Sequence, residues 1–120
     1  MIKNIATQAV YVADQKAAEE FWTKKIGFFI AAKHDMGNGY FWLEVGPKGA
    51  QSKLALYPKA LMEDWEKRLP SIVFDCTDVD ECFAQLKSSG VEVGAKPSQM
   101  KWGKFASFKD TDGNEFLIRS

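Results

Sequence analysis

Thr7-Gln-Ala-Val-Tyr-Val-Ala-Asp14 alternates in the manner of a β-strand and ends in an aspartate that can cap a helix. Ser71-Ile-Val-Phe-Asp-Cys-Thr-Asp78 repeats this arrangement in the second half of the chain. An apolar helical stripe follows each aspartate, and a glycine ends each stripe, Gly27 in the first half and Gly90 in the second. The chain therefore contains two copies of one structural unit.

Each predicted helix is followed by three strand-like stretches, with glycine-rich and aspartate-rich turn clusters between them. These stretches are 28–34, 40–45 and 53–57 in the first half, and 91–93, 105–108 and 115–119 in the second. The sequence predicts a single α+β domain over residues 1–120, built from two βαβββ modules, 1–58 and 69–120. We expect a curved, half-barrel mixed sheet with the helices on its convex face, and a helical linker over 59–68 that ends at Pro70.

The composition narrows the range of partners. Sixteen Lys and Arg residues balance sixteen Asp and Glu residues, so no net field recruits nucleic acid or an acidic membrane surface. No apolar stretch is long enough for a membrane span or a signal peptide, and we expect a cytoplasmic protein with a small-molecule partner. Cys76 and Cys82 fit no zinc or redox motif, and we interpret both as buried thiols. A disulfide remains the alternative if the strand end and the helix turn bring them together.

Alternation predicts which side chains line the concave face of the sheet. From the first half these are Thr7, Ala9, Tyr11, Tyr40, Trp42, Glu44, Lys53, Ala55 and Tyr57, and from the second half Ser71, Val73, Asp75, Glu115, Leu117 and Arg119. Aromatic planes with a few charges suit a planar or conjugated ligand, over which Trp102 is placed to close. A shift of the third strand by one residue would instead turn Phe41, Leu43 and Val45 inward.

From this face we select candidate ligand-binding residues, namely Thr7, Tyr11, Tyr40, Trp42, Tyr57, Ser71, Asp75, Trp102 and Arg119. Asp75 and Glu115 are weak candidates for catalytic proton transfer, because a lone carboxylate is poor evidence for a general base. His34 fits a surface position better than a catalytic one. No serine has a histidine at a recognisable spacing, and no glycine-rich phosphate loop follows a strand.

Several motifs together resemble one known family. They are Val10-Tyr-Val-Ala-Asp14, Glu20-Phe-Trp22, Ile26-Gly-Phe28, Leu54-Ala-Leu-Tyr-Pro58 and Phe108-Lys-Asp-Thr-Asp-Gly-Asn114. Over about residues 5–119 the chain resembles the glyoxalase/bleomycin resistance protein/dioxygenase family, also called the vicinal oxygen chelate family, with Thr111 where the family's turn usually has proline.

The resemblance implies a metal site with one ligand on the first and one on the last strand of each half. The matching positions here are Thr7, Ala55, Ser71 and Leu117, which do not offer the imidazole, thiolate or carboxylate groups of catalytic metal sites. We therefore expect no metal and no other cofactor.

What the resemblance implies for function is a metal-independent binding protein for an aromatic or conjugated small molecule, in drug or metabolite sequestration, and a homodimer. The alternative is a metal-dependent lyase of the glyoxalase I type, or a dioxygenase, whose ligands lie elsewhere. A structural dimer with a vestigial cleft is a third interpretation.

Overall fold

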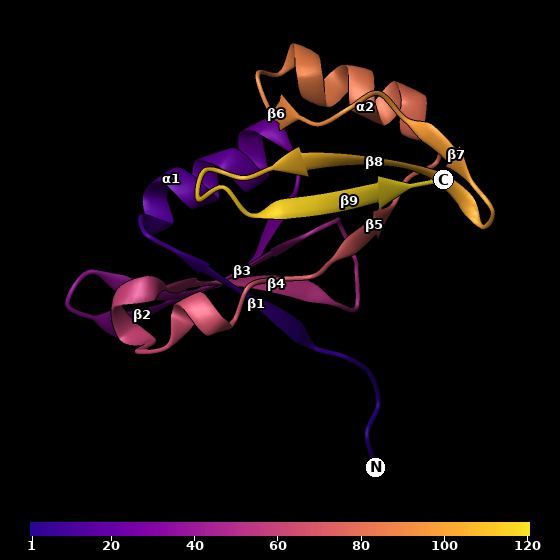
Figure 1. Ribbon diagram of the computed structural model, residues 1–120. Coiled ribbons are helices and arrows are strands. Elements are labelled where there is room, and N and C mark those ends of the chain that lie inside the picture. Colours follow the sequence, from indigo (N-terminus) through magenta and orange to yellow (C-terminus); the bar gives the residue numbers. More distant parts are fainter. The chain divides into compact units, whose positions relative to one another are not determined.

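Two aspartates begin the two α-helices of the computed structural model, which describes all 120 residues (Figure 1). The carboxylate of Asp14 accepts hydrogen bonds from the backbone amides of Lys16 and Ala17, at the start of α1 (Gln15–Glu20). At the start of α2 (Val79–Ser88), the carboxylate of Asp78 accepts hydrogen bonds from the backbone amides of Asp80 and Glu81. Both predicted caps are therefore present.

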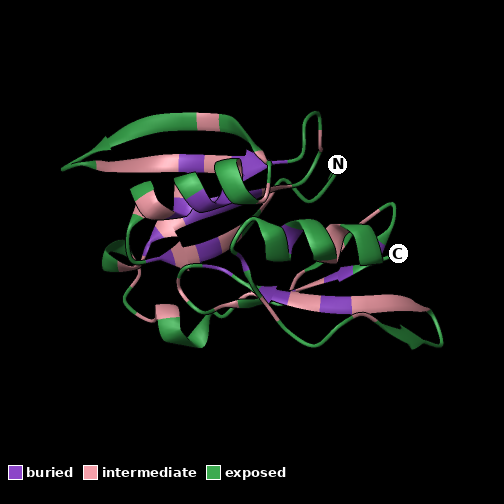
Figure 2. Cartoon of the chain, turned by 90° about the horizontal axis from the view of Figure 1, so that it is seen from above, coloured by how far each residue is buried: buried purple, intermediate pink, exposed green.

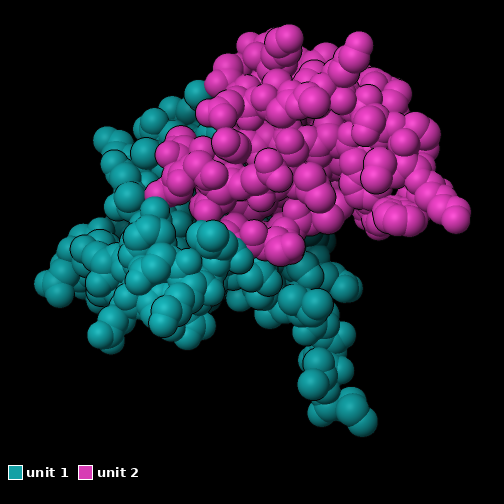
Figure 3. Space-filling model, in the orientation of Figure 1, with its two compact units in different colours: residues 1–69 teal, residues 70–120 magenta.

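The chain divides into two units, residues 1–69 and 70–120, which Figure 3 shows in different colours. Unit 1 carries a four-stranded sheet in the order β1-β4-β3-β2. Its strands are β1 (Thr7–Val12), β2 (Phe29–Gly37), β3 (Tyr40–Gly46) and β4 (Lys53–Pro58). β1 is parallel to β4, whereas β3 is antiparallel to both β4 and β2. Between β2 and β3, Gly37, Asn38 and Gly39 all adopt positive φ, which a tight hairpin requires.

The core of unit 1 lies on the face of the sheet that α1 covers. Side chains near the ends of β1 and β3 alternate between buried and half-buried, and this alternation is visible in Figure 2. In β4 three consecutive residues are buried. The buried apolar residues of the three strands are Val10, Val12, Leu43, Val45, Leu54, Ala55 and Leu56. β2, at the edge of the sheet opposite to β1, is exposed along almost its whole length.

The first helix changes its winding where two large rings follow one another. Phe21–Lys25 forms a π-helical turn, η1, after α1, and Phe21 and Trp22 are both buried within it. Trp22 stacks on Phe28 at a ring distance of 5.5 Å, with Phe21 edge-on to it at 5.3 Å. The sequence predicted one regular apolar stripe through Ile26, and the wider turn instead accommodates adjacent rings on the core side.

Unit 2 has the same plan with one additional strand. Its elements are β5 (Val73–Asp75), α2, β6 (Glu92–Val93), β7 (Ser98–Met100), β8 (Gly103–Lys109) and β9 (Glu115–Arg119). The sheet order is β5-β9-β8-β6, and β7 pairs with β8. β5 is parallel to β9, as β1 is to β4 in unit 1. Phe74, Phe108 and Phe116 form the aromatic centre of the unit, with ring distances of 5.5 to 6.2 Å.

The α+β class and the repeated modules are as predicted, and three details differ. The strands form two sheets, one in each unit. β7 was not predicted, because Ser98-Gln-Met100 lacks an apolar alternation and is exposed throughout. The predicted linker helix over 59–68 is wrong, since this segment forms only two short 3-10 turns, η2 (Lys59–Leu61) and η3 (Trp65–Lys67). No helix in the chain combines the length and apolar character needed to cross a membrane.

Candidate functional site: the open face of the first sheet

A row of aromatic rings crosses the face of the unit 1 sheet opposite to α1. The strand register places Tyr11 beside Tyr57, and His34 beside Trp42. The rings of Tyr11 and Tyr57 meet edge to face at 6.0 Å, and those of Trp42 and Tyr57 at 6.1 Å. Tyr11, Trp42 and Tyr57 are each half-buried, so their rings remain partly accessible to a ligand. This aromatic row, Tyr11-Tyr57-Trp42-His34, spans all four strands.

Small side chains lie next to the aromatic row. In the adjoining row, β1, β4 and β2 contribute Ala9, Ala55 and Ala32, and β3 contributes Glu44. The indole Nε1 of Trp42 donates a hydrogen bond of 2.7 Å to Oε2 of Glu44. This bond fixes the indole relative to the carboxylate. Among the small neighbours, Ala9 and Ala32 are half-buried and Ala55 is buried.

The third strand has the register that the candidate residues require. Leu43 and Val45 are almost fully buried on the α1 side, and Trp42 and Glu44 therefore point to the open face. Tyr40 differs from the expectation, because it lies at the β2–β3 hairpin and lines a pocket on the α1 side instead.

That pocket, of about 440 Å³, lies between α1 and the β2–β3 hairpin. Its walls include Phe41, Leu43 and Pro58, with an ion pair of 2.8 Å between Lys33 and Glu19. The ammonium of Lys33 also lies 4.8 Å from the ring centre of Phe41. Asp14, Lys16 and Glu20 also line this pocket, and the aromatic row is not part of it.

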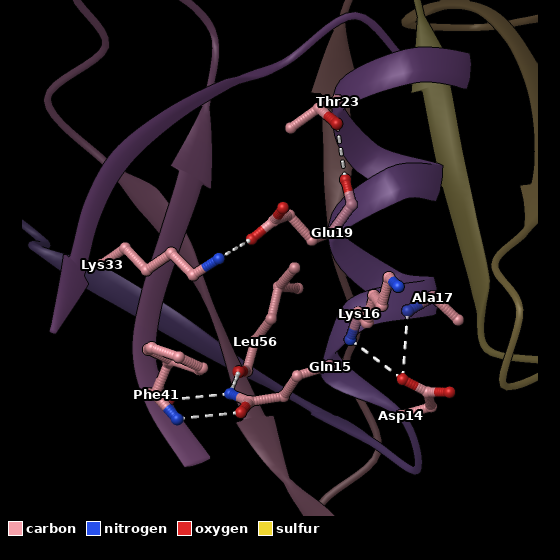
Figure 4. A network of polar contacts seen from close by, with 9 residues as sticks. All are labelled: Asp14, Gln15, Lys16, Ala17, Glu19, Thr23, Lys33, Phe41 and Leu56. Atoms are coloured by element: carbon pink, nitrogen blue, oxygen red, sulfur yellow. Dashed lines mark hydrogen bonds and ion pairs between the residues drawn. The ribbon is translucent and has the colours of Figure 1, made fainter. Parts of the chain in front are cut away.

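Gln15 connects α1 to the two central strands (Figure 4). Its Nε2 donates to the carbonyl oxygens of Phe41 at 2.7 Å and Leu56 at 2.8 Å, and its Oε1 accepts from the amide of Phe41 at 3.0 Å. Continuing the β3–β4 register places Phe41 opposite Pro58, which has no amide hydrogen to donate. The Gln15 amide provides donors at this end of the sheet, and sequence patterns alone gave no indication of that role.

In unit 2, an ion pair occupies the position that corresponds to the Tyr11–Tyr57 pair of unit 1. Asp75 lies opposite Arg119 in the β5–β9 register, as Tyr11 lies opposite Tyr57 in unit 1, and Arg119 Nε donates to Asp75 Oδ1 at 2.7 Å. Both side chains of this ion pair are exposed. Glu115 lies at the other end of β9, opposite Lys109, so the two weak catalytic candidates are not brought together.

The remaining candidates in unit 2 are dispersed. Ser71 precedes β5 and is exposed, and Trp102 is 71% exposed in the turn between β7 and β8. The structure therefore joins candidate residues into two clusters, Tyr11-Tyr57-Trp42 in unit 1 and Asp75-Arg119 in unit 2. Thr7 lies on β1 two rows from Tyr11, opposite Lys53.

Comparison with known proteins identifies the family. The model of the Glyoxalase/Bleomycin resistance protein/Dioxygenase superfamily matches residues 4–118. The chain belongs to this superfamily. It is 53% identical to the protein YetH of Bacillus subtilis (strain 168), over 99% of both chains.

Two solved structures of the glyoxalase superfamily type have the same fold. A superfamily member from Sphaerobacter thermophilus DSM 20745 is 28% identical, with a TM-score of 0.87 over 98% of this chain and 97% of its own. TnmS3, an antibiotic binding protein from Streptomyces sp. CB03234, is 32% identical, with a TM-score of 0.83 over 98% of this chain and 95% of its own.

The metal-ligand positions implied by the glyoxalase superfamily hold Thr7, Ala55, Ser71 and Leu117. Ala55 and Leu117 have only aliphatic side chains, and Thr7 and Ser71 offer hydroxyl groups alone. No group of three or more His, Cys, Asp or Glu residues is arranged to hold a metal ion. The residues at these positions therefore do not fit a catalytic divalent metal, which needs three or four strong donors that converge.

Proposed function

We propose that this superfamily member binds a planar aromatic or conjugated small molecule without a metal, and so sequesters a drug or metabolite. The observation that carries the proposal is the aromatic row Tyr11-Tyr57-Trp42, whose rings are fixed by edge-to-face contacts and are still partly accessible. Rigid aromatic side chains contribute a large contact area at a small entropic cost, which suits flat ligands.

The relatives support this proposal. TnmS3 is an antibiotic binding protein, and its sequence is related to this chain over almost the full length of both. The Trp42–Glu44 hydrogen bond also favours binding, because it orders the indole before a ligand arrives. The proposed site is centred on Tyr11, Trp42 and Tyr57, with Thr7 at its margin.

Further parts of the proposal concern the whole chain. Ser71, Asp75, Trp102 and Arg119 remain proposed ligand-binding residues of the second module, and we propose that residues 1–120 are one domain. We also propose a homodimer and a cytoplasmic location. Tyr40 leaves the set, because it lines the α1-side pocket.

A ligand screen with matched tyrosine variants tests the proposed site. Conjugated antibiotics and metabolites, together with the three-ring probes acridone and 9-aminoacridine, are titrated against the protein by calorimetry and tryptophan fluorescence. Tyr57→Ala removes the ring at the centre of the row, and we expect it to weaken binding by about tenfold or more.

Tyr40→Ala is the control, because it removes the same kind of side chain from the β2–β3 hairpin, where Tyr40 lines the pocket beside α1. The affinity of this variant for each ligand should stay within about twofold of the affinity of the unmodified protein. If no compound binds, or if only Tyr40→Ala weakens binding, the proposed open-face site is wrong.

A further inference from the structure

The open face of the unit 1 sheet contains one carboxylate. The side chains that β1 to β4 direct to this face are Thr7, Ala9, Tyr11, Ala32, His34, Trp42, Glu44, Lys53, Ala55 and Tyr57. Glu44 alone carries a negative charge among them. It lies in the row of small side chains, directly beside the aromatic row.

The carboxylate of Glu44 is only partly satisfied. Its Oε2 accepts the Trp42 indole hydrogen at 2.7 Å, and no lysine or arginine forms an ion pair with it. Glu44 lies opposite Ala55 on one side and Ala32 on the other, and neither methyl group can donate a hydrogen bond. Glu44 is half-buried, so its second oxygen, Oε1, remains partly accessible and can accept a hydrogen bond from a ligand.

Two cationic or titratable side chains share this face, and neither neutralises Glu44. Lys53 lies in the next row, opposite Thr7 and beyond Ala55. His34 is exposed and lies opposite Trp42 rather than Glu44. A ligand that covers Glu44 without supplying a positive charge or a donor would bury an incompletely paired carboxylate, which is costly.

The aromatic rings of this face also favour a positively charged ligand. The faces of tyrosine and tryptophan rings attract cations, and Trp42 holds the carboxylate next to such rings. We infer that the ligand of the open face is a planar aromatic cation, whose protonated nitrogen group is read by Glu44. This inference rests on the proposed function of the same face and specifies the ligand class.

A pair of probes with the same three-ring skeleton tests the inference. 9-Aminoacridine is cationic at neutral pH and acridone is neutral, so the comparison isolates the charge. Glu44→Gln keeps an oxygen that accepts from Trp42 but removes the charge. We expect it to weaken 9-aminoacridine binding by about tenfold and to leave acridone binding within about twofold.

Glu20→Gln is the matched control, because it removes one negative charge from the α1 side of the same unit. This variant should bind 9-aminoacridine and acridone with the same affinities as the unmodified protein. Equal effects of Glu44→Gln on both probes, or no effect on either, overturn the inference. The proposed function survives that result if Tyr57→Ala still weakens both probes, and it fails together with the inference if neither probe binds.

Discussion

Cys76 shows how burial determines the chemistry of a thiol. It follows β5, and both Cys76 and Cys82 of α2 are half-buried free thiols. Burial, followed by the hydrogen bond with Cys82, raises the pKa of Cys76 to about 12. At neutral pH the thiolate form of Cys76 is therefore very rare, and the thiol is a poor nucleophile.

Alkylation kinetics test this pKa. We expect iodoacetamide to modify Cys76 very slowly at pH 7, with a rate that rises about tenfold per pH unit because the thiolate fraction does. Peptide mapping by mass spectrometry measures the rate at Cys76 separately from Cys82. Cys82→Ala removes the neighbouring thiol, which contributes to the raised pKa of Cys76, and should increase the rate at Cys76. Rapid modification of Cys76 at pH 7 in the folded protein would contradict the assignment.

Among the elements, α1 depends on Gln15 for its attachment to β3 and β4. Gln15→Ala removes three hydrogen bonds and leaves polar backbone groups of Phe41 and Leu56 without these partners. We expect the free energy of unfolding to fall by about 1–3 kcal/mol. Urea denaturation followed by circular dichroism measures the change.

Gln85→Ala is the control for that experiment, because Gln85 is an exposed residue of α2. It should change the free energy of unfolding by less than about 0.5 kcal/mol. If both variants lower the free energy of unfolding equally, the hydrogen bonds of Gln15 make no special contribution to stability.

The elements also show what the sequence predicts well. Asp14 and Asp78 are local signals, since a cap acts on the next turn of its own helix, and both helices begin where expected. Alternation assigned Trp42 and Glu44 to one face of β3, and burial of Leu43 and Val45 agrees with it. Such local periodicities persist in β1, β3, β8 and β9 because each of these strands has one buried face.

Features that depend on pairing between distant segments escaped the sequence patterns. The bonds of Gln15 join residues far apart in the chain, and the Asp75–Arg119 ion pair exists because β5 and β9 are parallel neighbours. The 59–68 segment has helix-forming composition, but Leu61 remains 45% exposed and no apolar face packs to stabilise a helix. Helix propensity alone therefore could not predict the conformation of residues 59–68.

At the scale of the whole molecule, binding should not depend on a metal. Thr7, Ala55, Ser71 and Leu117 do not supply a converging set of strong donors. We expect chelation with EDTA, and separately addition of nickel, zinc, manganese or iron, to leave ligand affinity within about twofold. Elemental analysis of protein purified without chelator gives the metal content directly. One equivalent of metal per chain, with a loss of affinity on chelation, would overturn the proposal.

The two modules carry different side chains at equivalent positions of the same strand arrangement. Where the first and last strands of a module run side by side, unit 1 has Tyr11 against Tyr57, and unit 2 has Asp75 against Arg119. Neither pair belongs to the buried core or to a helix cap, so these positions can diverge without loss of the fold. A substitution at either pair therefore changes the surface of its own module and leaves the other module as it was.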